Sequence, residues 1–260
     1  MHDTAFSVGR LAMERYCDLP TAEILEIGSY NVNGTLRDCA HARTRYTGLD
    51  FEEGPGVDIV IVPGQEWPVK DDRFDLVMAS SVLEHDPLFW MTFLTMCGKA
   101  RAGGYIYLNV PSNGSFHRYP QDYWRFYPDS GGALERWAQS QAVDVRLVES
   151  FITRRAGDQW NDFVAIFRKS GPVGSLPEHF VHPDIPCFNV KTWQSDDILN
   201  PAAETEDMTL LAETRRTVEE MGAEIKILRQ QARLEQIDHM IDKLGIIVDR
   251  LINRLPESAG

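Results

Sequence analysis

Hydrophobic and polar residues alternate along the first 170 residues in a pattern that predicts strands separated by helices. Short apolar runs predict seven strands, at residues 24–28, 45–50, 57–62, 74–79, 105–110, 144–151 and 163–168. Amphipathic stretches predict helices at residues 7–18, 35–42, 88–99 and 133–140. Strands that alternate with helices indicate an α/β domain with a seven-stranded, mostly parallel sheet. No helix is predicted between the last two strands, so we expect them to form an antiparallel hairpin at one edge of the sheet.

The pattern changes after Lys169. Residues 171–206 contain five prolines and show little periodicity, which predicts a linker or extended arm between a domain at 1–170 and a helix at 207–256. Apolar residues in this helix recur at spacings of four and three, the repeat of a coiled coil: Ile237, Ile241, Leu244, Val248, Leu251 and Leu255. An upstream set keeps the same spacing before the phase slips: Val218, Met221, Ile225 and Leu228. We therefore expect a homo-oligomer held by a coiled coil; the alternative is a helix that folds back on the domain.

The stretch ILEIGSYNVNGT at residues 24–35 contains the most informative local pattern. A buried strand runs into a glycine- and asparagine-rich loop, which in an open α/β sheet is the usual place for a nucleotide-like ligand. Glu26 would need a cation or hydrogen-bond donors, and Asp50 ends the next strand, where a carboxylate can hold ribose hydroxyls. Tyr30 occupies the position of the second glycine in the dinucleotide fingerprint. The stretch favours a ligand with a ribose and a positive charge but no pyrophosphate.

Charge and composition exclude several classes of protein. The formal net charge of -13 argues against a nucleic-acid partner, which requires a basic surface. Four scattered cysteines without a C-x-x-C pair indicate ordinary thiols, and we identify no cluster with metal-ligand spacing. No apolar run is long enough to span a bilayer, and no signal peptide is evident. We expect a soluble, cytoplasmic protein.

Several motifs, taken together, resemble those of the class I S-adenosylmethionine-dependent methyltransferases. They are, in order, Glu26-x-Gly28, Gly48-Leu49-Asp50, Phe74-Asp75-Leu76-Val77, Leu83-Glu84-His85 and Gly103-Gly104. The segments EIGSYNVNG, VLEHDP-x-FW and FHRYPQDYWRFYPD look like a bacterial branch associated with the synthesis of glycans and secondary metabolites. The resemblance covers roughly residues 5–170, and it implies a Rossmann-like fold with S-adenosylmethionine as cofactor.

The resemblance also implies roles for residues at the strand ends. Glu26 would lie near the methionine ammonium, and Gly28 would let that end of the ligand approach the backbone. Asp50 would take both ribose hydroxyls, and Phe51 could lie against the adenine. The remaining cofactor positions at these ends are Ser29, Tyr30 and Asn33 in the first loop, with Ser80 and Ser81 after the fourth strand.

The loop that reads adenine departs from the family pattern. The family usually places an aspartate after the third strand, but this chain has Val-Pro-Gly-Gln-Glu-Trp at residues 62–67. The backbone N–H of Gly64 and the side chain of Gln65 or Glu66 are the expected substitutes.

Transfer of a methyl group to a hydroxyl requires an aligned acceptor and a base. We favour His117 as the base, with Asp122 and His85 as further catalytic candidates, since His117 and Asp122 lie in the loop after the fifth strand. His85 could instead hydrogen-bond a loop or a helix start, and Asp122 could pair with Arg118 or Arg125. Nearby aromatic residues could line an acceptor pocket or pack in the core: Tyr119, Tyr123, Trp124, Phe126 and Tyr127.

These observations predict methyl transfer from S-adenosylmethionine to an oxygen, on a sugar or a glycan precursor. Four alternatives remain open at this point: a methyltransferase of a small-molecule metabolite, a non-catalytic assembly protein that works through its coiled coil, a nicotinamide-dependent oxidoreductase, and a metal-assisted transferase. Tyr30 disfavours the oxidoreductase, and a metal-assisted transferase would need ligands that the sequence pattern does not reveal.

Overall fold

The computed structural model describes residues 3–157, 160–171, 177 and 179–252. The chain divides into two compact units, residues 1–203 and 204–260. The first unit holds a single mixed sheet with helices on both faces, and the second holds one long helix.

Nine strands form the sheet, in the order β3-β2-β1-β4-β5-β7-β6-β8-β9. Their bounds are β1 Glu23–Ile27, β2 Arg45–Asp50, β3 Ile59–Val60, β4 Phe74–Ser80, β5 Ala100–Pro111, β6 Val145–Thr153, β7 Asp162–Lys169, β8 Cys187–Thr192 and β9 Ser195–Leu199. The five strands from β3 to β5 pair in parallel, and all pairs from β5·β7 onward are antiparallel. The parallel half has the strand order of a doubly wound, Rossmann-like fold.

Two layers of apolar side chains cover the two faces of this sheet. Helix α1 (Asp3–Tyr16) packs on one face, while α2 (Phe89–Lys99) and α3 (Ser130–Ser140) contribute to the core on the other. In β4, Val77 belongs to the core beneath α2, and Met78 belongs to the core beneath α1. Because both faces of the central strands are buried, their sequences read as continuous apolar runs, which is why β1, β4 and β5 were predictable.

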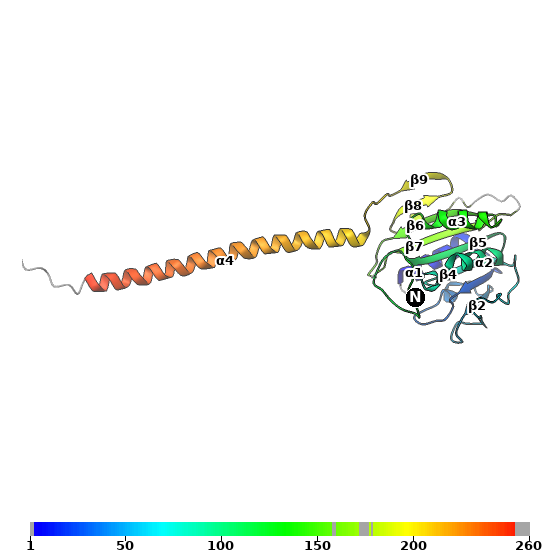
Figure 1. Cartoon of the computed structure of the whole chain (residues 1–260), viewed down its shortest axis with the longest axis horizontal. Helices are drawn as coiled ribbons and strands as arrows, with labels where there is room; N and C mark the ends of the chain where they lie inside the picture. The colour runs from blue at the N-terminus through cyan, green and yellow to red at the C-terminus, as the bar shows by residue number, and fades with distance from the viewer. Residues whose placement is uncertain (1–2, 158–159, 172–176, 178, 253–260) are drawn as a thin grey trace, which may run out of the picture. The chain divides into compact units, whose positions relative to one another are not determined.

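The structure corrects the expected strand count and the expected edge. Figure 1 shows β8 and β9 beyond β6, so the sheet has nine strands rather than seven. Strand β7 returns between β5 and β6, which places the β6–β7 hairpin inside the sheet, and β8 and β9 form the edge hairpin instead. Both additional strands lie in residues 171–206, where the prolines indicated a linker or arm.

The connections on the β1–β2–β3 side are shorter than the sequence pattern suggested. The helix predicted at 35–42 is only the single turn η1 (Leu36–Cys39), and the strand predicted at 57–62 narrows to β3. Arg37 explains part of this difference, because its guanidinium donates to the Asp58 carboxylate and to the Gly56 carbonyl (3.1 Å). These hydrogen bonds hold the loop after β2 against η1. The helix and the strand on either side of this contact are correspondingly short.

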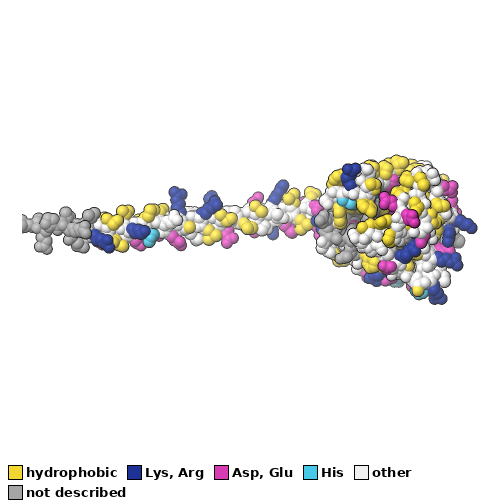
Figure 2. All heavy atoms as spheres, turned by 90° about the horizontal axis from the view of Figure 1, so that it is seen from below, with side chains coloured by type: hydrophobic (Ala, Val, Ile, Leu, Met, Phe, Trp, Pro, Cys, Tyr) yellow, Lys and Arg dark blue, Asp and Glu magenta, His cyan; other side chains and the backbone are white. Residues whose placement is uncertain are grey.

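Helix α4 (Glu206–Ile252) is continuous over 47 residues, about 70 Å at 1.5 Å per residue. Every side chain from Asp207 to Arg250 is exposed, and Figure 2 shows hydrophobic side chains spaced along the helix. Leu255, the last residue of the predicted heptad series, lies outside the described residues. None of the helices in the described part of the chain combines the length and apolarity that crossing a membrane requires.

A buried carboxylate, Glu149 of β6, joins three separate parts of the first unit. It is fully buried and accepts hydrogen bonds from the Tyr16 hydroxyl of α1 and from the backbone N–H groups of Val181 (2.7 Å) and His182 (3.1 Å). The His182 ring nitrogen Nδ1 lies 2.8 Å from Oε2 of Glu149, the same oxygen that accepts the His182 backbone N–H. Burial and the adjacent carboxylate raise the pKa of Tyr16 far above its usual range, so the hydroxyl stays a donor.

We expect Tyr16→Phe to lower the free energy of unfolding by about 1–3 kcal/mol, because one donor to a buried charge is lost. Urea denaturation of the whole chain measures this difference. Tyr119→Phe is the matched control, since Tyr119 is 60% exposed and its hydroxyl can remain hydrated. Equal losses in both variants would show that Glu149 does not depend on Tyr16.

Candidate functional site

The strand order creates a switch point at the carboxyl end of β1. Strand β1 pairs with β2 on one side and with β4 on the other, and the chain continues in opposite directions from this centre. The loops after β1, β2 and β4 therefore emerge at one edge of the sheet, where ligands bind in open α/β folds. Most residues of the predicted cofactor site lie in these loops.

Gly28 is required by a close approach between two of these loops. Its φ is +73°, and a Cβ atom there would lie 2.2 Å from Cγ2 of Val82, in the segment after β4. The N–H groups of Gly28 and Ser29 both donate to the Leu49 carbonyl of β2, at 2.9 and 3.1 Å. The glycine thus allows the loops after β1 and β4 to touch over the end of the sheet.

Asp50 connects the ends of β1 and β2 through its carboxylate. Oδ2 accepts the backbone N–H of Tyr30 at 3.0 Å. Oδ1 accepts the N–H groups of Phe51 at 2.7 Å and Glu52 at 3.3 Å. Because each carboxylate oxygen can accept more than one hydrogen bond, Asp50 retains capacity for a ligand hydroxyl while its position is set by the backbone.

Glu26 is buried within β1 on the side of the sheet covered by α1, since it alternates with Leu25 and Ile27 in the opposite core. Its Oε2 accepts a hydrogen bond from the Tyr46 hydroxyl of β2 at 2.9 Å. Burial raises the pKa of Glu26 to about 7, although the Tyr46 hydrogen bond opposes that shift. The carboxyl is therefore poised to ionise near neutral pH when a cation approaches.

The other predicted cofactor residues differ in their environments. Ser29 is buried, and its hydroxyl oxygen, like that of Ser80, has no hydrogen-bond partner among the described residues. Ser81 has a φ of +55° and donates its N–H to the Asn109 carbonyl at 2.9 Å. Asn33 is exposed, and Phe51 is 57% exposed, so both side chains are accessible from solvent.

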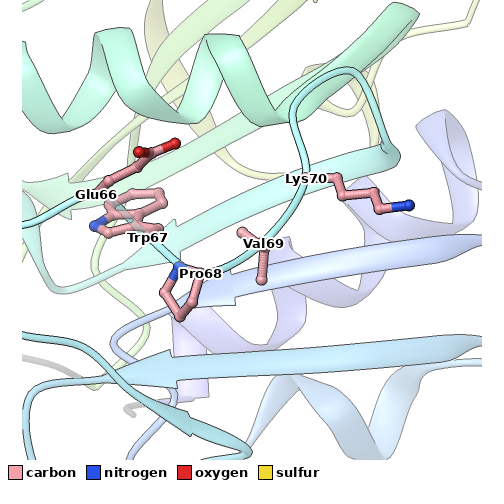
Figure 3. Close-up of a pocket in the computed structure, with 5 residues that line it drawn as sticks. All are labelled: Glu66, Trp67, Pro68, Val69 and Lys70. Carbon is pink, nitrogen blue, oxygen red and sulfur yellow. The ribbon is translucent and has the colours of Figure 1, made fainter.

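The loop after β3, expected to read adenine, is largely exposed. Gly64 has a φ of +77°, and a Cβ atom there would meet no other atom within 4 Å. Gln65 donates its N–H to the Val62 carbonyl at 3.1 Å, which closes a turn. Trp67 turns inward and joins the core. A shallow hollow lined by residues 66–70 follows, in which Figure 3 shows Lys70 directed away from Glu66 and Trp67.

This hollow is not the cofactor site that the sequence predicts. The Val69 carbonyl accepts a hydrogen bond from Lys99 at 3.0 Å, and Lys99 ends α2 immediately before β5 begins. The hollow therefore extends toward the amino ends of the parallel strands, whereas the switch point lies at their carboxyl ends. None of Glu26, Gly28 or Asp50 lines it.

The three predicted catalytic residues come together although 37 positions separate the first from the last. The rings of His85 and His117 meet edge to face, with centroids 4.8 Å apart. The His117 backbone N–H donates to Oδ2 of Asp122 at 2.8 Å, and the His117 Nδ1 atom lies 3.4 Å from the same oxygen. The loop after β5 and the turn η2 (Leu83–His85) thus form one polar cluster.

Asp122 is held by Arg125 rather than by Arg118. The two guanidinium nitrogens of Arg125 bind its two carboxylate oxygens at 2.5 and 2.8 Å. This ion pair lowers the pKa of Asp122 to about 2. Asp122 is therefore an ionised, hydrogen-bonded support for the loop, which favours the ion-pair alternative over a role as base.

Sequence reasoning missed Glu84 as a candidate functional residue. Its side chain is 1% exposed, burial raises its pKa to about 8, and its Oε2 has no hydrogen-bond partner among the described residues. Its backbone carbonyl accepts the N–H groups of Tyr123 (2.8 Å) and Trp124 (3.2 Å), which anchors the loop after β5. The signal available in the sequence was the adjacent pair Glu84-His85, in the short segment that follows a buried strand.

Most of the predicted acceptor-pocket aromatics are exposed, and one is not. Phe126 is buried in the core, while four residues are 36–60% exposed: Tyr119, Tyr123, Trp124 and Tyr127. Trp160, which the sequence did not single out, packs against the His117 ring with centroids 4.7 Å apart. A Cβ on Gly114 would lie 2.1 Å from the Trp160 ring, so this glycine makes room for the tryptophan.

Comparisons with known proteins find similarity in structure only. No model of a protein family matches the chain, and no curated protein matches it significantly. The structure of 1,6-didemethyltoxoflavin-N1-methyltransferase from Burkholderia thailandensis, with bound 1,6-didemethyltoxoflavin and S-adenosylhomocysteine, aligns over 65% of this chain and 77% of its own, at 19% identity and a TM-score of 0.47. The cyclase SpnF aligns over 64% of this chain and 82% of its own, at 11% identity and a TM-score of 0.48.

Phosphoethanolamine N-methyltransferase 2 of Haemonchus contortus, in complex with phosphomonomethylethanolamine and S-adenosylhomocysteine, aligns over 64% of this chain at 12% identity and a TM-score of 0.45. This chain spans about half of that protein, 53% of its length. All three TM-scores are below 0.5, so these similarities place the chain in no family and assign it no ligand.

Proposed function

We propose that this chain is an S-adenosylmethionine-dependent methyltransferase whose cofactor binds at the carboxyl ends of β1, β2 and β4. The observation that carries the proposal is the arrangement around Asp50. Its carboxylate is held by backbone N–H groups at the end of β2, directly beside the tight loop at Gly28. With the ribose of S-adenosylmethionine bound to Asp50, the methionine end of the same cofactor would point toward Ser80 and Ser81. The order of the motifs in the sequence supports the same assignment.

The acceptor in this proposal is a hydroxyl of a sugar or a glycan precursor. In this proposal the acceptor binds beside the cluster of His85, His117 and Asp122. His85 follows the segment after β4 whose Val82 side chain covers Gly28. Exposed rings of Tyr119, Tyr123 and Tyr127 offer the flat apolar faces that sugars favour. A hydroxyl of a small metabolite is the competing acceptor.

Calorimetry with S-adenosylmethionine and S-adenosylhomocysteine, followed by transfer of a labelled methyl group to sugars and nucleotide-linked sugars, tests the proposal. Binding of both ligands with transfer to a sugar hydroxyl would support it in full. Transfer only to non-sugar metabolites would replace the acceptor. Binding without turnover on any acceptor would favour the assembly-protein alternative, and no binding would overturn the enzyme.

The affinity for S-adenosylmethionine is expected to rise as the pH increases from 6 to 7.5. Below its pKa of about 7 the Glu26 carboxyl is protonated, and an ammonium binds the carboxylate rather than the neutral acid. The ionised fraction grows over this interval, so affinity should increase by about fivefold to tenfold, until the ammonium of the ligand itself deprotonates near pH 8. Calorimetry at each pH measures the affinity. It should also detect the proton that the Glu26 carboxyl releases when the ligand binds.

Glu26→Gln is expected to flatten this dependence, since the amide does not titrate. Glu52→Gln serves as the control, because Glu52 is exposed in the loop after β2 and should leave the slope unchanged. If the wild-type affinity did not vary between pH 6 and 7.5, Glu26 would not be the group that binds the ammonium of the ligand.

We also propose that α4 associates with a second copy of this chain as a coiled coil. The apolar side chains of its repeat are 40–60% exposed from Ile237 to Val248, and an isolated helix draws little stability from its own hydrogen bonds. Burial of this stripe against an identical helix would remove it from water along the described length of the repeat.

A further inference from the structure

Three potential metal ligands converge beside the proposed acceptor site. Glu84, His85 and His117 each offer one ligand atom, and these atoms all lie within 4.8 Å of one another. Glu84 and His85 come from the turn η2, and His117 comes from the loop after β5. Because 31 residues lie between His85 and His117, no local spacing in the sequence signals this group.

The hydrogen bonding of His85 leaves one of its nitrogens free to bind a metal. Its Nδ1 is bonded to the backbone carbonyl of Gln121. A carbonyl can only accept, so Nδ1 carries the proton, and in the neutral ring Nε2 carries the lone pair. That Nε2 atom faces Glu84, 3.5 Å from its Oε1. Metal-binding histidines are oriented in the same way, with the second nitrogen donating to a carbonyl or carboxylate.

Glu84 lacks the cation that a buried carboxylate requires. Among the described residues, His85 is its one ion-pair partner, and the Oε2 atom accepts no hydrogen bond. The nearby guanidinium of Arg125 is already bound to both oxygens of Asp122. A carboxylate in this position is costly unless a positive group enters the cluster.

His117 is positioned by contacts that leave its ring available. Its backbone N–H is bound by Asp122, and its ring packs on Trp160. The Nδ1 atom is buried without a hydrogen-bond partner among the described residues, since its 3.4 Å approach to Asp122 does not meet hydrogen-bond geometry. Buried polar atoms in a protein interior normally have hydrogen-bond partners. Here Oε2 of Glu84 and Nδ1 of His117 both lack a partner among the described residues.

From this geometry we infer that Glu84, His85 and His117 bind a divalent transition-metal ion such as Zn²⁺. Two imidazoles with one carboxylate suit zinc or ferrous iron better than magnesium or calcium, which prefer oxygen ligands alone. Zinc–nitrogen bonds of about 2.0–2.1 Å place tetrahedral ligand atoms about 3.3 Å apart, so the three side chains need to close by up to about 1.5 Å. Three protein ligands leave a further position open, as in catalytic zinc sites.

The role of the ion rests on the proposed function. In that reaction the acceptor hydroxyl binds the open position and loses its proton to solvent water, because a bound cation lowers the pKa of the hydroxyl. The oxygen then forms a bond to the methyl carbon as the carbon–sulfur bond breaks, leaving a methyl ether and S-adenosylhomocysteine. His117 acts as a ligand in this scheme rather than as the base that the sequence suggested.

Metal titration of the untagged, chelator-treated whole chain tests the site directly. We expect each chain to bind one Co²⁺ or Zn²⁺ ion. Visible absorbance measures the binding of Co²⁺, and calorimetry measures the binding of Zn²⁺. Glu84→Gln and His117→Asn should each weaken binding by at least about 100-fold, since each removes one of three ligands. His41→Asn is the matched control, because His41 is exposed and distant in sequence, and it should bind like the wild type.

Thermal unfolding of each variant separates loss of the site from loss of the fold. If Glu84→Gln does not fold, His117→Asn decides the result, since the His117 side chain is 34% exposed and its backbone carries the bond to Asp122. Absence of stoichiometric binding, or equal affinities in wild type and a folded ligand variant, would overturn the metal site. S-adenosylmethionine binding to the metal-free chain is measured in parallel, so failure of the metal site and failure of the proposed function give different results.

Discussion

Asp50→Ala is expected to weaken the binding of S-adenosylmethionine by about 100-fold or more. Two ribose hydroxyls donating to a carboxylate contribute hydrogen bonds to a charged group, each worth about 1.5–3 kcal/mol, so their joint loss exceeds the roughly 2.8 kcal/mol that 100-fold represents. The alanine also releases the backbone N–H groups of Tyr30 and Phe51, which loosens both loops at the edge of the sheet. Calorimetry with S-adenosylmethionine and with S-adenosylhomocysteine measures the loss.

Two further variants make this result specific. Asp50→Asn can still accept hydrogen bonds but lacks the charge, so its affinity should lie between those of the wild type and the alanine variant. Glu52→Ala removes a neighbouring exposed carboxylate and should bind normally. If Asp50→Ala bound within threefold of the wild type, the ribose would not lie on Asp50, and the assignment of this edge of the sheet would fail.

If α4 associates as proposed, Ile241→Asp is expected to convert the proposed oligomer into a monomer at micromolar concentration. Ile241 is 59% exposed on α4 and is the second residue of the repeat that begins at Ile237 and continues through Leu244 and Val248. The aspartate carboxylate would be buried in the apolar interface between the two helices, where no positive group compensates its loss of water. We therefore expect association to weaken by about 100-fold or more. Sedimentation or light scattering of the whole chain reports the mass directly.

The same chain offers a closely matched control in Ile246→Asp. Ile246 is 54% exposed on α4 but falls outside the three- and four-residue repeat. The chemical change is identical, and only its position relative to the seam differs. Equal masses for the two variants, or a monomeric wild type, would remove the coiled coil from the proposal and favour the alternative of a helix folded back on the domain.

Much of the sheet could be predicted because its central strands are buried on both faces. Val77 and Met78 are adjacent in β4, yet each enters a different apolar core, so the strand reads as an unbroken apolar run. Strand β9 has the opposite character. All five of its residues are exposed, including two aspartates, and it exists as a strand because it pairs with β8. No apolar pattern announces such an edge strand.

The candidate site divides in the same way. Gly28 and Asp50 could be predicted because each sits at the end of its own strand, where a short motif specifies the backbone. The sequence offered two arginines, Arg118 and Arg125, as ion-pair partners of Asp122. In the structure Arg125 forms a bidentate ion pair with Asp122. Glu84 was overlooked because a carboxylate becomes unusual only when burial deprives it of water and of a cation, and the adjacent Glu84-His85 pair does not by itself indicate that burial.

By itself the sequence determined the parallel core of this protein, the tight loop at Gly28, the acid at Asp50 and the long C-terminal helix. These features depend on residues close together in the chain, through apolar periodicity, backbone conformation and helix propensity. Only the tertiary structure decided that β7 lies between β5 and β6, that residues 187–199 extend the sheet, and that Glu84 and His85 meet His117. Such contacts join distant segments, and they depend on which surfaces the packed core brings together and closes to water.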